Sequence, residues 1–205
     1  MRSLLIAASS FLLFSCASSY KTINPERLNY TANNLDDGIL FSYKYDVLFE
    51  SRNKKYSKHE ERENIKLTAI KITNNTGNKI NIANDCVFYI GDKPVATMNS
   101  NVIVDALKQN TPIYLLYLLL FPVKLYETES NGYSTTQREI FPIGYILAPG
   151  ISTGNMIVAS NANKNFRYEI YHYNINRDVE NGQTAYFLVG FRDIGYDAIT
   201  LKLKK

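Results

Sequence analysis

Apolar and polar residues alternate along several segments of this chain, and a period of two predicts β-strands that bury one face. The clearest example is 39–50, where every second residue is apolar or aromatic. At 65–73 the apolar phase shifts, which predicts a strand with either a bulge or two buried faces. Shorter strands are predicted at 80–82, 86–90, 184–191 and 199–203. The two ends of the chain are therefore predicted to be rich in β-strands.

The middle of the chain has a different pattern. Apolar residues at helical spacing predict a short helix within 98–109. Thr111 and Pro112 then resemble an N-cap and a first helical position, so a second helix is expected over the apolar run that follows. At roughly 1.5 Å per residue this run is too short to cross a bilayer.

Turn and loop residues separate the other segments. Asn131-Gly132 predicts a hairpin that joins 123–126 to 133–141. Pro149 is expected to prevent one continuous helix after 140, so the next helix is predicted from 155 onward. The segment 166–175 fits either the end of that helix or a Tyr-rich strand, and the charged segment 51–63 is expected to be a mobile loop.

Two of the middle segments, 111–123 and 140–160, stand out for their apolar character. Lys124 is the one charged residue that adjoins the first of them, and neither segment contains a charge. They are expected to form either the buried core of an insertion or a surface that faces a membrane or a partner, because large exposed apolar patches mark such sites.

The N-terminus is typical of an export signal. Arg2 precedes the apolar run 4–14, which is too short to span a membrane. The run ends in Leu13-Phe14-Ser15-Cys16, which resembles the lipobox of bacterial lipoproteins. The alternative is an ordinary cleaved signal peptide with Cys16 as a plain thiol.

The lipobox resemblance implies several properties of the chain. In that family the signal, here 1–15, is removed and the cysteine, here Cys16, carries covalent lipid. Ala17 stands where an inner-membrane retention signal would have Asp, which implies the outer membrane, and the lack of acidic residues after Cys16 implies a periplasm-facing leaflet. The abundance of Asn, Ile, Tyr and Lys resembles envelope lipoproteins of Bacteroidota. Residues 16–38 are polar and aperiodic, so they are expected to form a flexible tether.

The remaining residues, 39–205, are expected to form a single mainly β (α+β) domain. The strand and Asn-rich turn at 70–77 and the strand after Gly182 resemble immunoglobulin-like antiparallel β-sandwich domains. The chain has no Trp and so lacks the Cys–Trp–Cys core of antibody domains. The resemblance implies a sandwich with an α-containing insertion at about 98–175.

Composition and charge limit the chemistry. The formal net charge is +4 and there is no long Lys/Arg run, so no nucleic-acid partner is expected. His59 is expected on an exposed loop, and Cys86 is expected to be a small buried hydrophobe. No His or Cys spacing fits a zinc site, and no cofactor is expected other than the lipid on Cys16.

The predicted function is that of a lipid-anchored, non-enzymatic binding or assembly component with a protein partner in the envelope. A possible interaction surface is formed by the following residues: Tyr114, Tyr117, Tyr168, Tyr171, His172 and Tyr173. One alternative is a glycan-active hydrolase that uses carboxylates such as Glu169, Asp193 and Asp197. A second alternative is a protein whose segments 111–123 and 140–160 associate with the membrane.

Overall fold

The computed structural model describes residues 16–30 and 32–204, which divide into two compact units. The larger unit contains Tyr20–Lys108 and 163–204, and the smaller unit contains 16–19 and Gln109–Ala162. The expected signal peptide, 1–15, lies outside the described residues. The expected insertion at about 98–175 corresponds in part to the smaller unit, which is compact in its own right.

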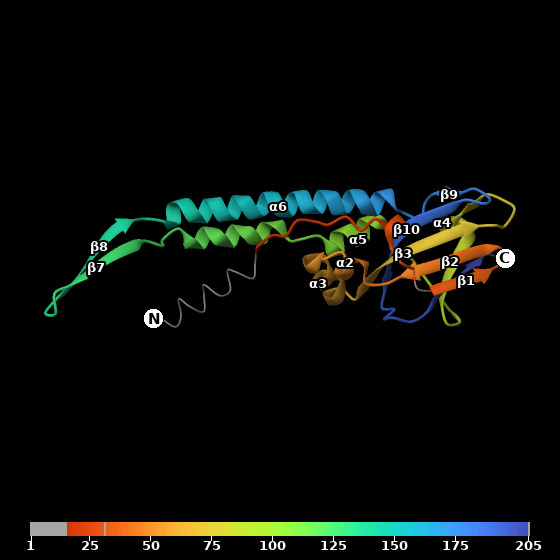
Figure 1. Ribbon diagram of the computed structural model, residues 1–205, viewed down its shortest axis with the longest axis horizontal. Helices are drawn as coiled ribbons and strands as arrows, with labels where there is room; N and C mark the ends of the chain where they lie inside the picture. Colours follow the sequence, from red (N-terminus) through yellow and green to blue (C-terminus); the bar gives the residue numbers. More distant parts are fainter. Residues whose placement is uncertain (1–15, 31, 205) are drawn as a thin grey trace. The chain divides into compact units, whose positions relative to one another are not determined.

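A four-stranded antiparallel sheet is the largest element of the larger unit (Figure 1). Its strand order is β1-β2-β3-β10, with β1 at Ala32–Asp36, β2 at Ile39–Lys44, β3 at Ile65–Asn74 and β10 at Thr184–Arg192. β3 pairs with β10 without a register shift, for example Ile70 opposite Phe187. The phase change in β3 therefore reflects burial on both faces and not a bulge.

A second antiparallel sheet has the order β11-β5-β6. Its strands are β5 (Cys86–Ile90), β6 (Lys93–Val95) and β11 (Ile199–Leu203). Buried side chains of both sheets belong to one core cluster, in which Phe41 and Phe88 lie edge to face at 6.1 Å. Strands are thus confirmed at both ends of the chain, except that the strands predicted at 39–50 and 80–82 end at Lys44 and Asn81. The fold is a mixture of helices and open antiparallel sheets.

Helices replace two segments for which other structures were predicted. The strand predicted over 39–50 ends at Lys44, because Asp46 adopts a positive φ of 57° and the chain enters α2 (Val47–Glu50). The segment predicted as a mobile loop contains α3 (Lys54–Arg62), which buries Tyr56, Ser57 and Glu60 on one side. The predicted helix within 98–109 is confirmed as α5 (Ser100–Leu107).

Much of the segment expected to be a flexible tether is folded. Tyr20 and Ile23 are buried, and a short 3-10 helix, η1 (Pro25–Arg27), follows them. β1 then pairs with β2 through a turn at Asp37 and Gly38, both of which have positive φ. An added Cβ at Gly38 would lie 2.9 Å from the carbonyl oxygen of Asn75, so this turn requires glycine.

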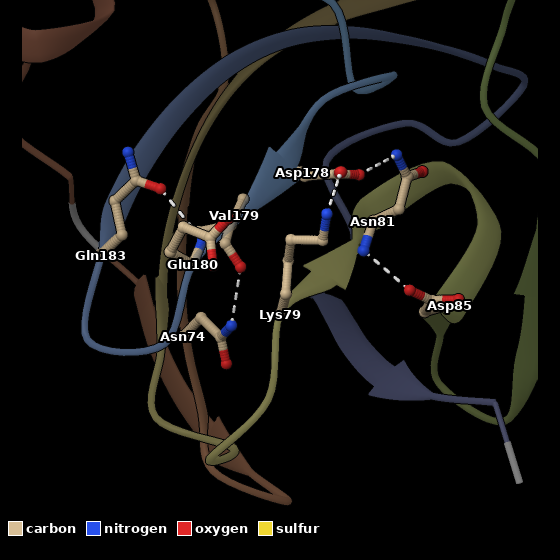
Figure 2. Close-up of polar contacts among 8 residues, drawn as sticks. All are labelled: Asn74, Lys79, Asn81, Asp85, Asp178, Val179, Glu180 and Gln183. Atoms are coloured by element: carbon tan, nitrogen blue, oxygen red, sulfur yellow. Dashed lines mark hydrogen bonds and ion pairs between the residues drawn. The ribbon is translucent and has the colours of Figure 1, made fainter.

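A polar network holds the strand pair β4 (Ile80–Asn81) and β9 (Asp178–Val179), as Figure 2 shows. The Asp178 carboxylate accepts a hydrogen bond from Asn81 Nδ2 at 2.9 Å and pairs with Lys79 Nζ at 2.9 Å. Asn74 Nδ2 donates to the Val179 carbonyl at 2.8 Å. These contacts pair hydrogen-bonding groups at strand edges and in loops, so we assign the network a structural role. The helix α4 (Ile82–Asp85) follows β4.

The smaller unit contains a β-hairpin and two helical segments. The 3-10 helix η2 (Thr111–Leu120) leads to β7 (Leu125–Ser130) and β8 (Thr135–Phe141), the hairpin predicted from Asn131-Gly132 (Figure 1). The helix α6 (Gly144–His172) then begins in this unit, and its residues after Ala162 belong to the larger one.

The expectation that Pro149 interrupts the helix is wrong. Pro149 is the sixth residue of α6, so the helix continues on both sides of it. Proline removes one backbone hydrogen bond, here to the carbonyl of Tyr145, and this loss falls near the helix start. The strand alternative for 166–175 is also wrong, since α6 continues to His172.

Candidate functional site

The chain directly after Cys16 is bound to the smaller unit. The Ala17 amide donates to Asn155 Oδ1 at 2.6 Å. Ser18 is held on both sides by Gln109, whose Oε1 accepts from the Ser18 amide at 3.3 Å and whose Nε2 donates to the Ser18 carbonyl at 2.7 Å. Neither amide side chain had been singled out from the sequence, because nothing in their local pattern distinguishes them from other polar residues.

Tyr114 and Tyr117 form the core of the smaller unit together with Ala159. Their exposed fractions are only 2% and 4%, so neither ring is available as an exposed interaction surface, contrary to the sequence expectation. Burial raises the pKa of Tyr114. Ala17 also packs against this cluster, which joins the residue after Cys16 to the core.

The other side chains of η2 and early α6 are mostly exposed. We call them the apolar helix surface, defined by residues of η2 and of α6 with the adjoining Phe121: Ile113, Leu115, Leu116, Leu118, Leu119, Phe121, Tyr145, Ile146, Leu147, Ile157 and Val158. Leu119 is 75% exposed and Ile146 is 62% exposed. Of the two expectations for these segments, a buried core and an exposed surface, the exposure favours the second for most residues.

Charge is distributed unevenly in the smaller unit. Residues 109–123 and 140–163 contain none, and the five charged residues of this unit lie at 124–139, in and beside the hairpin. Lys124 and Glu139 form an ion pair there at 2.7 Å. The apolar helix surface can therefore enter an apolar environment without burying an ionised side chain, which would be costly.

Gly144 allows the start of α6 to approach the end of η2. Its amide donates to the Val123 carbonyl at 2.8 Å, and an added Cβ would lie 2.2 Å from the Leu120 carbonyl oxygen and 2.4 Å from that of Phe121. These are backbone atoms, which cannot move aside as a side-chain tip can. The glycine is therefore required by packing.

Gly144→Ala is expected to destabilise the smaller unit by about 2 kcal/mol, because the methyl group must displace η2 or α6. Gly150→Ala is the matched control, since a Cβ there meets nothing within 4 Å and alanine favours a helix. Urea unfolding followed by circular dichroism measures both. Equal midpoints for the two variants would contradict the packing role of Gly144.

Aromatic residues gather at the end of α6 in the larger unit. His172 stacks on Tyr168 with ring centroids 5.8 Å apart and contacts Tyr173 edge to face at 4.7 Å. Tyr168 is exposed, while the Tyr171 hydroxyl donates to Asn101 Oδ1. Four of the six residues expected at an interaction surface therefore lie within 168–173, and His172 contacts two of the others, Tyr168 and Tyr173.

Glu169 lies on the same helix but is buried. Its carboxylate accepts hydrogen bonds from the Tyr20 hydroxyl at 2.5 Å and from the Ile23 amide at 2.9 Å. The Asn24 amide donates to Oε1 at 3.2 Å. Burial, together with the negative charge of Glu169, raises the pKa of Tyr20 well above its usual range. Glu169 thus holds the N-terminal segment of the larger unit.

The carboxylates considered for a hydrolase lie on different elements. Glu169 is on α6, whereas Asp193 and Asp197 lie in the loop between β10 and β11. Asp193 Oδ1 accepts from Asn64 Nδ2, and the Asp197 backbone carbonyl accepts from the Tyr45 hydroxyl at 2.7 Å. Glu169 and Asp193 thus accept hydrogen bonds through their carboxylates, whereas the contact of Asp197 is made by its backbone carbonyl.

The remaining chemically notable side chains are also in packed environments. His59 is on α3 and half-buried, not on an exposed loop, and burial lowers its pKa. Cys86 is buried as expected, and burial raises the pKa of its thiol to about 11. In the part of the chain that the structure describes, no group of three or more His, Cys, Asp or Glu is arranged to hold a metal ion.

None of the helices within 16–30 and 32–204 combines the length and the apolar character that crossing a membrane requires.

In comparisons with known proteins, no protein-family model, no curated protein and no solved structure matched this chain.

Proposed function

We propose that this protein is a lipid-anchored, non-enzymatic component of the cell envelope whose smaller unit lies against the membrane surface. In this proposal Cys16 carries covalent lipid, and the apolar helix surface enters the boundary between headgroups and acyl chains. The observation that carries the proposal is the position of Cys16, which is bound through its neighbours to the unit that exposes the apolar helix surface.

The short connection after Cys16 supports this orientation. Consecutive Cα atoms are about 3.8 Å apart, so Ala17, which is hydrogen-bonded to Asn155, lies one step from the lipid-bearing residue. A flexible tether would leave the folded unit free to move away from the bilayer. Without one, lipid on Cys16 holds the smaller unit at the membrane.

The energetics favour the same arrangement. Burial of apolar area contributes roughly 25 cal/mol per Å², so transfer of several half-exposed Leu and Ile side chains is worth several kcal/mol. No ionised side chain has to be transferred with the helices, because the charges of this unit lie in and beside the hairpin. A surface-bound helical segment of this kind needs no transmembrane length.

The larger unit would then be available to a partner. We propose that its two sheets form the layers of an immunoglobulin-like sandwich, an assignment supported by the single core that contains side chains of both. Tyr168, His172 and Tyr173 are proposed to contact an envelope protein, because aromatic side chains are enriched in protein interfaces. The outer membrane, with the protein on its periplasmic side, is the proposed location.

Vesicle flotation tests the membrane contact separately from the lipid. Unlipidated Cys16→Ser protein is expected to float with phosphatidylethanolamine–phosphatidylglycerol vesicles. Addition of Leu116→Asp and Leu119→Asp should weaken this binding at least about tenfold, because two apolar contacts are lost and two charges would have to be buried.

The control places the same charges on exposed apolar residues of the larger unit, Leu35→Asp with Phe49→Asp. This double variant should bind vesicles as the Cys16→Ser protein does. If Cys16→Ser protein stays entirely with the soluble fraction, or if both double variants bind equally, the proposed membrane contact is wrong.

A further inference from the structure

A groove of about 430 Å³ lies in the smaller unit, with Cys16 on its wall. Tyr117 and Leu120 of η2 and Gly150, Ile151 and Gly154 of α6 line it. Its volume falls within the roughly 300–1,000 Å³ typical of small-ligand sites, and such sites are lined mainly by apolar side chains. No charged residue contributes to it.

The two glycines leave space within the groove. They lie four residues apart and therefore on the same face of α6. A Cβ added to either one would meet nothing within 4 Å, so close packing of α6 on η2 does not explain them, in contrast to Gly144. Because they have no side chains, Gly150 and Gly154 leave open the groove that larger side chains would fill.

Hydrogen bonds position Cys16 beside this groove. Asn155 also lines the groove, and its Oδ1 accepts from the Ala17 amide at 2.6 Å while its Nδ2 donates to the Ile151 carbonyl at 2.9 Å. The second bond orients the Asn155 amide on its own helix. Residue 16 is thereby held at the groove and not at the end of a free segment.

We propose that the groove binds one acyl chain of the lipid carried by Cys16. This inference rests on the proposed function, since it requires the lipid. The groove is apolar, lacks charge and starts at the residue that bears the chain, so the acyl chain can enter it without release of any contact at Ala17.

Photo-crosslinking of the full chain tests the inference. Cells of a lipoprotein-processing bacterium are grown with a palmitate analogue that bears a diazirine, and the protein is irradiated in membranes and digested. The expected result is label on Cys16 together with crosslinks within the same chain, to peptides that contain 117–120 and 150–158.

Two leucine variants provide the matched comparison. Gly154→Leu fills the groove and is expected to lower the yield of these crosslinks roughly tenfold, since the added side chain takes the volume that the acyl chain needs. Thr153→Leu adds an apolar side chain at the adjacent, exposed position and should leave the yield unchanged. Leucine is a good helix former, so both variants are expected to fold.

The possible outcomes distinguish the binding of an acyl chain in the groove from the presence of a lipid anchor on Cys16. Label on Cys16 with crosslinks only to phospholipid or to a second protein chain would overturn the acyl-chain groove and leave the lipid anchor in place. Absence of label on Cys16 would overturn both. Equal crosslink yields in Gly154→Leu and Thr153→Leu would also overturn the assignment of the groove.

Discussion

Glu169→Ala is expected to lower the free energy of unfolding of the larger unit by about 4 kcal/mol. The substitution leaves the Tyr20 hydroxyl and the Ile23 amide, both in buried surroundings, without their acceptor, and each unpaired donor costs roughly 1–3 kcal/mol. It also opens space beside Tyr20, whose ring packs against Tyr56 and Phe166. Urea denaturation of the purified protein measures the change.

Glu169→Gln is the conservative counterpart of this substitution. It retains a side-chain oxygen for the Ile23 amide but removes the charge that strengthens the bond from Tyr20, so about half of the effect is expected. Tyr20→Phe combined with Glu169→Gln in a double-mutant cycle isolates the hydroxyl–carboxylate contact. A loss below about 0.5 kcal/mol in Glu169→Ala, the size of an ordinary surface substitution, would show that Glu169 does not hold the N-terminal segment.

The second large effect is a pH dependence from Glu60. This side chain is 3% exposed, and burial raises the pKa of its carboxyl group from 4.5 to about 7. The Leu67 amide, which donates to Oε1 at 2.6 Å, favours the ionised form but offsets only part of this shift. The folded state therefore binds the Glu60 proton more tightly than the unfolded chain does.

The sign of the effect follows from this difference in proton affinity. Below pH 4.5 the carboxyl is protonated in both states, so stability is highest there with respect to this group. Between pH 4.5 and about 7 the unfolded chain releases the proton first, so the free energy of unfolding falls as pH rises, by about 3 kcal/mol in total. Above about pH 7 the free energy of unfolding stays lower by this full amount.

Glu60→Gln should remove this part of the pH dependence. The amide resembles the neutral acid and can still accept from Leu67, so the variant is expected to match the parent protein near pH 4.5 and to exceed its stability at pH 8. Glu129→Gln removes the same charge at an exposed position of β7 that does not contribute to the raised pKa of Glu60, so it should leave the pH profile as it is. Thermal unfolding at several pH values measures all three, and parallel profiles would rule out a buried proton on Glu60.

Strands with a local signal were predicted well. The alternation in β5 and β11 extends over five residues in each strand, and the turns after β5 and before β10 contain Gly91 and Gly182, which adopt positive φ. Side-chain alternation and glycine conformation depend on the nearest neighbours in the chain, so they can be predicted from the sequence. The hairpin at Asn131-Gly132 was predicted for the same reason.

Elements that depend on distant partners were predicted poorly. α3 has few apolar residues. The burial of Glu60 on its inner side is favoured by the Leu67 amide of β3, which donates a hydrogen bond to the Glu60 carboxyl group. The N-terminal segment looks like a linker because its anchors are single residues, Tyr20 and Ile23, whose acceptor Glu169 is more than 140 positions away. A periodic pattern in the local sequence does not indicate contacts between residues that are so far apart in the chain.

The sequence by itself determined the strand-rich ends, the apolar and uncharged character of 111–123 and 140–160, and the lipobox-like residues before Cys16. These properties depend on residue type and short-range order. Only the tertiary structure decided that Tyr114 and Tyr117 are buried while Leu116 and Leu119 are exposed, and that Ala17 is bound to Asn155. Exposure depends on which face of a helix is covered by another element, and that is set by packing between segments far apart in the chain.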